Sequence, residues 1–72
     1  MDADILQSKL DEYGEVMVLV EEIDEPLELH QHDTEIDGEM VTLQLTDGEL
    51  YFNVDRITSL WKHYHSTEDY GL

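Results

Sequence analysis

The chain has 72 residues, of which 19 are Asp or Glu and only 3 are Lys or Arg, so its formal net charge is −16 at neutral pH. This length allows one domain with a thin core. The absence of cysteine excludes a disulfide-stapled secreted scaffold. No apolar run approaches the roughly 20 residues of a membrane span, and Asp2 and Asp4 stand where a secretory leader carries basic residues. We therefore expect a cytoplasmic protein without a membrane partner.

The negative charge requires screening. Like charges on so small a surface repel one another and destabilise the folded state. In molar salt the Debye length falls to about 3 Å, so a halophilic cytoplasm would tolerate this charge. A basic partner would neutralise it instead. The acids are mostly spread along the chain rather than gathered in one stripe, which favours the halophilic interpretation over an acidic DNA mimic or another binder of basic partners.

The first expected element is a short helix over residues 2–13. Asp2 or Asp4 can cap its N-terminus. Its apolar residues fall on one stripe of a helix. Gly14 stands where a residue in the left-handed conformation commonly ends a helix.

Four antiparallel strands are expected next. The apolar run Val16–Val20 predicts the first strand, and alternating apolar and polar residues predict the others. The sequence Thr46-Asp47-Gly48 favours a tight hairpin between the last two. The expected strands span residues 15–23, 27–33, 39–45 and 49–54.

Residues 55–65 leave two alternatives open. Four of them have the spacing of a helix face: Ile57, Leu60, Trp61 and Tyr64. The β-branched and aromatic content of the segment favours a fifth strand instead, and we expect the strand. The predicted fold is an α+β domain over residues 1–65, with an N-terminal helix packed on a four- to five-stranded antiparallel sheet or small open barrel. Residues 66–72 are expected to form a flexible tail.

The stretch Gly48–Leu60 (GELYFNVDRITSL) and the acidic composition resemble small acidic haloarchaeal proteins of unassigned function. That resemblance spans most of the chain, supports the halophilic interpretation and carries over no functional residues. The order of one helix and five strands is also similar to Sm-like small barrels. Such barrels hold RNA with basic loops, which this chain lacks, so nucleic-acid binding is not expected.

The four histidines form two His-x-His pairs: His30 with His32, and His63 with His65. On a strand, residues i and i+2 point to the same face, and neutral imidazole is a ligand for Zn, Ni or Cu. Glu28 or Asp33 could add a carboxylate. The pairs are therefore candidate ligands for a divalent transition metal. The alternative is that they are polar residues on a solvated face.

Residues 56–67 contain no acid but include two of the three basic residues, which makes them a candidate contact surface. Exposed aromatic and Arg side chains are favoured at the centres of interfaces. The candidate partner-binding residues are Arg56, Trp61, Lys62, His63, Tyr64 and His65. The alternative is that Trp61 and Ile57 complete a thin core.

Catalysis is not expected, because carboxylates are so abundant that no pair is distinctive for acid–base chemistry. No glycine-rich phosphate loop is present either. The sequence predicts a non-enzymatic interaction module of a halophilic cytoplasm, which forms a homodimer and binds a protein partner through residues 56–67. The alternatives are a metal-binding protein that uses the His-x-His pairs, and an acidic DNA mimic. No cofactor is expected apart from the metal of the first alternative.

Overall fold

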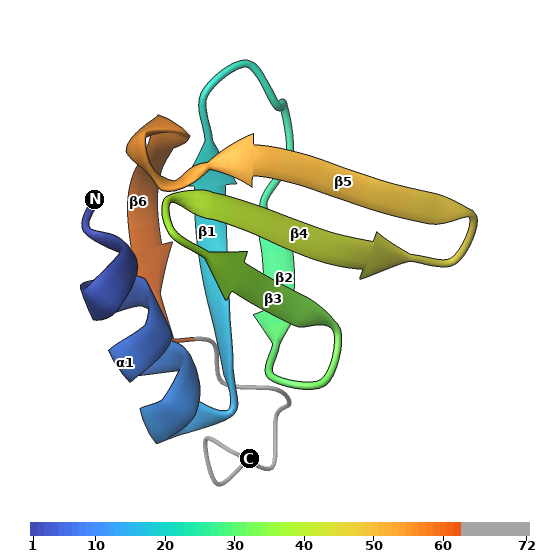
Figure 1. The fold of residues 1–72 in the computed structure, drawn as a ribbon. Helices are drawn as coiled ribbons and strands as arrows, with labels where there is room; N and C mark the ends of the chain where they lie inside the picture. Colours follow the sequence, from blue (N-terminus) through green and yellow to red (C-terminus); the bar gives the residue numbers. More distant parts are fainter. Residues whose placement is uncertain (63–72) are drawn as a thin grey trace, which may run out of the picture.

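The structure is a computed structural model that describes residues 1–62. His63, Tyr64, His65 and the tail expected at 66–72 lie outside the described residues. Within residues 1–62, one helix packs with two three-stranded antiparallel sheets (Figure 1). The predicted α+β class, with an N-terminal helix on antiparallel strands, is confirmed. The division into two sheets, with one strand more than expected, was not predicted.

Helix α1 spans Ala3–Tyr13, and both of its ends follow the sequence signals. The carboxylate of Asp2 accepts a hydrogen bond of 2.8 Å from the backbone N–H of Asp4, which caps the N-terminus. Gly14 adopts φ 80°, and its N–H donates to the carbonyl of Leu10. The buried residues Leu6 and Leu10 form the face of α1 that enters the core.

The first sheet has the order β2–β1–β6, with β1 in the centre. These strands span Glu15–Val20 (β1), Leu27–His30 (β2) and Ile57–Trp61 (β6). Every second residue of β1 is buried, which directs Val16, Val18 and Val20 into the core. The register with β6 shifts between Leu19 and Val20, where the ladder is irregular.

The second sheet is a meander with the order β3–β4–β5. Its strands span Thr34–Asp37 (β3), Met40–Leu45 (β4) and Gly48–Asn53 (β5). The sequence pattern missed β3 because Ile36 is the only apolar residue in that strand. Gly38, with φ 61°, makes the turn from β3 to β4. The hairpin of β4 and β5 closes at the predicted turn after Leu45.

Residues 55–65 begin with a turn that leads into a strand. A 3-10 turn, η1, spans Val54–Arg56, and the side chain of Asn53 caps it by accepting from the N–H of Asp55. The strand expected in this segment then occupies Ile57–Trp61. The helical alternative is therefore wrong for these five residues.

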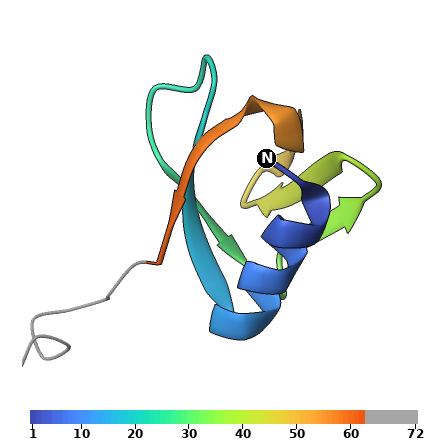
Figure 2. The same cartoon turned by 90° about the vertical axis from the view of Figure 1, so that its left-hand side faces the viewer.

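The strands of the second sheet cross those of the first at a steep angle (Figure 1), and α1 lies beside β1 and β6 (Figure 2). One apolar cluster joins the helix and both sheets: Leu6, Leu10, Val16, Val18, Val20, Leu29, Val41, Leu43, Phe52, Val54 and Ile57. Among residues 1–62, no helix has the length and apolar character needed to cross a membrane.

Candidate metal centre

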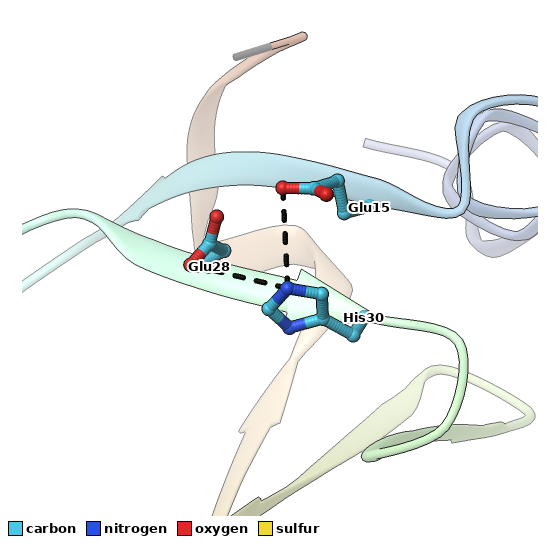
Figure 3. Close-up of side chains that lie close together, drawn as sticks. All are labelled: Glu15, Glu28 and His30. Carbon is cyan, nitrogen blue, oxygen red and sulfur yellow. Dashed lines mark ion pairs between the residues drawn. The ribbon is translucent and has the colours of Figure 1, made fainter. Parts of the chain in front are cut away.

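Three potential metal ligands meet where β2 ends beside the start of β1 (Figure 3). The register places Glu15 directly opposite His30, and Met17 opposite Glu28. Glu28 and His30 are two residues apart on β2 and therefore share one face of the strand. Leu29, between them, points the other way into the core. Strand pairing thus places Glu15, Glu28 and His30 together on the outer face of this sheet.

The His30 ring directs one nitrogen towards both glutamates. Its Nε2 atom is 3.9 Å from Oε2 of Glu15 and 3.9 Å from Oε1 of Glu28. One ligand atom from each of the three residues lies within 4.8 Å of those of the other two. Ligands of a tetrahedral Zn²⁺ site with bonds near 2.1 Å are separated by roughly 3.4 Å. Small side-chain rotations would therefore bring this set to coordination distance.

The site is partly enclosed by the protein. The exposed side-chain fractions are 20% for Glu15, 30% for His30 and 37% for Glu28. Oε2 of Glu15 has almost no contact with solvent. Partial burial strengthens the attraction of the carboxylates for a cation, and the exposed side lets an ion enter. Three protein ligands would leave a fourth tetrahedral position for water.

A third carboxylate lies on the other side of the imidazole. Oδ2 of Asp33 is 3.4 Å from Nδ1 of His30. Oδ1 accepts hydrogen bonds from the backbone N–H of His30 (2.9 Å) and from the hydroxyl of Thr34 (2.8 Å).

These bonds determine the ionisation of Asp33. Burial alone would raise the pKa of its carboxyl group. The hydrogen bonds from Thr34 and from the backbone of His30, together with the charge of His30, outweigh burial and lower the pKa below its usual range. Asp33 is therefore an ionised group at neutral pH and can only accept hydrogen bonds.

The structure brings together some of the predicted ligands and leaves out others. His30 is central, and Glu28 supplies a carboxylate. His32 lies exposed in the turn after β2; its ring centroid is 5.2 Å from that of His30, but His32 is not one of the three convergent ligands. The predicted ligands His63 and His65 lie outside the described residues.

Glu15 was not predicted as a ligand. It is separated from His30 by a loop and part of two strands, so only the register of β1 with β2 brings the two together. Register depends on the conformation of the intervening loop as well as on the apolar pattern. The loop contains Glu22 with φ 74°, which no local sequence signal indicates.

Of residues 56–67, which contain no acid, the structure describes 56–62, and these are divided between core and surface. Ile57 is buried, as the core alternative expected. Trp61 has 37% of its surface exposed. Arg56 is exposed and forms an ion pair with Glu21. The Nζ atom of Lys62 lies 5.2 Å from the centroid of the Tyr13 ring.

No family model matches the chain, and no curated protein or solved structure matches it. The arrangement of its side chains is therefore the ground for a functional assignment.

Proposed function

We propose that the protein binds one divalent transition metal ion through Glu15, Glu28 and His30. The observation that supports this is the convergence of one imidazole nitrogen and two carboxylate oxygens within 4.8 Å. Imidazole selects transition metals over Mg²⁺ and Ca²⁺, which prefer ligand sets made only of oxygen. Two carboxylates bring two negative charges to a divalent cation. Zn²⁺ is the natural first probe.

The ion would act on the stability of the fold. Glu15 belongs to β1, whereas Glu28 and His30 belong to β2, so one ion would cross-link the two strands. It would also remove the repulsion between two neighbouring carboxylates in a chain that already carries −16. Since the unfolded chain has no such cluster, the binding free energy would add to the free energy of unfolding. We infer a binding role for this site.

Zn²⁺ titration followed by isothermal calorimetry tests this proposal. Excess Mg²⁺ should be present to occupy the many surface carboxylates. We expect one saturable site in the wild type, and its loss in Glu15→Gln, Glu28→Gln and His30→Ala. Two matched controls should keep the site, because they change the same residue types elsewhere: Glu25→Gln in the exposed loop after β1, and His32→Ala.

Other outcomes would count against the site. If Glu25→Gln weakened binding as much as Glu15→Gln, the Zn²⁺ would be held by diffuse charge alone. If a double variant, His63→Ala with His65→Ala, abolished binding while His30→Ala did not, the ion would be held elsewhere. Retention of the site in His30→Ala would by itself exclude the proposed ligand set.

We also propose that Arg56 and Trp61 belong to a surface for self-association and for a protein partner in a halophilic cytoplasm. Trp61 is exposed at the end of β6, and within residues 1–62 this strand pairs only with β1. Light scattering at high salt should show a wild-type dimer, with Trp61→Ala shifted towards monomer. Tyr51→Ala, which removes another exposed aromatic, is the control. A monomeric wild type at roughly 100 μM would exclude micromolar self-association.

A further inference from the structure

We infer that Asp33 is the positioning residue of the metal site, which turns the Nε2 lone pair of His30 towards the ion. This inference rests on the proposed metal-binding function. A neutral imidazole carries its proton on one nitrogen and offers a lone pair on the other. Only the form with the proton on Nδ1 can bind a metal through Nε2, which is the atom that faces Glu15 and Glu28.

The contacts of the ring favour that form. Oδ2 of Asp33 is 3.4 Å from Nδ1, closer than the 3.9 Å that separates Nε2 from either glutamate oxygen. A carboxylate can only accept, so it attracts the proton to Nδ1. Metal-bound histidines in general donate their second ring N–H to a carboxylate, a carbonyl or water, which fixes both tautomer and ring orientation.

Asp33 is itself held in place by its other oxygen. Oδ1 accepts from the backbone N–H of His30 and from the Thr34 hydroxyl. The backbone carbonyl of Asp33 accepts a hydrogen bond of 2.8 Å from the N–H of Gln44 in β4. The carboxylate is thus held by His30 and Thr34, and the backbone of Asp33 is held by the second sheet, which leaves Oδ2 close to Nδ1 of the ring.

Because Oδ1 and Oδ2 of Asp33 have different partners, Asp33→Asn is a selective test. The backbone N–H of His30 can only donate, so the atom that replaces Oδ1 must be the amide oxygen. The amide NH₂ group then takes the place of Oδ2 and faces Nδ1 of His30. Because NH₂ donates, it requires a lone pair on Nδ1 and moves the ring proton to Nε2, where it blocks the metal. The substitution keeps the bond to the His30 backbone but inverts the tautomer.

The experiment combines two measurements on the full chain. Ring ¹⁵N chemical shifts of His30 in the metal-free protein, at an alkaline pH where imidazole is neutral, report the tautomer. Calorimetry with Zn²⁺ reports affinity. We expect Nδ1–H in the wild type, Nε2–H in Asp33→Asn, and an affinity about 10- to 100-fold lower in the variant. Thr34→Val, which removes a donor to Oδ1 only, should keep the wild-type tautomer and nearly its affinity.

Results that contradict the positioning role can be told apart from results that contradict the metal site. If the wild type bound Zn²⁺ and Asp33→Asn bound it equally well, or kept Nδ1–H, the positioning role would be excluded while the metal site stood. If the wild type bound no Zn²⁺, both the metal function and this role would be overturned. A metal-free melting temperature of Asp33→Asn near that of the wild type, together with lost affinity, would separate positioning from a merely structural role.

Discussion

Arg56 and Glu21 are joined by two separate bonds, one between side chains and one between backbones. Nη1 of Arg56 lies 2.9 Å from Oε1 of Glu21. The backbone N–H of Glu21 donates to the carbonyl of Arg56 at 2.7 Å. The backbone bond continues the contact between the first and last strands of the first sheet beyond the irregularity at Leu19 and Val20. The ion pair lies over that bond on the surface.

Arg56→Gln should lower the free energy of unfolding by less than about 1 kcal/mol in high salt, because exposed ion pairs contribute little. Both side chains are more than half exposed. In dilute buffer the loss should be larger, since the chain gives up one of only three basic residues. Lys9→Gln, which removes the charge facing Glu12 within α1, is the control for the loss of one basic residue. Equal losses at all salt concentrations, measured by urea unfolding, would contradict an electrostatic origin.

The stability of the whole fold should also increase with salt concentration. With a net charge of −16, we expect incomplete folding in dilute buffer at neutral pH and recovery of the fold in molar KCl. Circular dichroism against KCl concentration measures this. Cooperative, stable folding at roughly 20 mM salt would argue against the halophilic interpretation.

Gly14→Ala should lower the free energy of unfolding by about 1–2 kcal/mol, the cost of the left-handed conformation for an L-residue. Gly14 has φ 80°, and a Cβ atom added there would meet no atom within 4 Å, so backbone strain is the only expected cost. Gly48→Ala is the matched control, because that site is also open and its φ is not positive. Equal losses in the two variants would mean that the conformation of Gly14 does not matter.

Tyr51 should ionise at higher pH than an ordinary tyrosine. Its hydroxyl donates a hydrogen bond to Glu49, and this bond and the negative charge of Glu49 raise the pKa of Tyr51. The same bond, helped by Gln44, lowers the pKa of Glu49. For Tyr51, the raised folded-state pKa means that its contribution to stability is present below the unfolded pKa. That contribution is lost as the pH rises through the folded pKa.

Absorbance titration of tyrosinate checks this, with Tyr51→Phe identifying the Tyr51 component. Glu49→Gln should move that component towards the ordinary pKa, whereas Glu39→Gln should leave it in place. A Tyr51 component that did not move in Glu49→Gln would exclude the hydrogen bond as its cause.

The sequence predicts those elements whose signals are local. The α1 boundaries follow from Asp2 and Gly14, whose roles depend only on neighbouring backbone groups. The β4–β5 hairpin follows from the Asp47-Gly48 turn. The split into two sheets depends on how the chain bends between His30 and Thr34, which no pattern of apolar residues encodes.

The candidate site, too, could be predicted only in part from the sequence. His30 and Glu28 were recognisable because they are neighbours on one strand. Glu15 required the register of two strands, and the approach of Asp33 to Nδ1 required the turn that brings its carboxylate back towards the His30 backbone. The position of Glu15 depends on strand register, and that of Asp33 depends on the shape of a turn. Residue types and their spacing alone therefore did not reveal either residue.

The central place of β1 in its sheet has a consequence for synthesis on the ribosome. Val20 pairs with Ile57, which at about 5–20 residues per second is added between about two and seven seconds later. Until then, β1 has one open edge. Helix α1 and β2 are made earlier than β6. The first sheet therefore cannot be completed until most of the chain has been made, and one edge of β1 stays without its native partner until then.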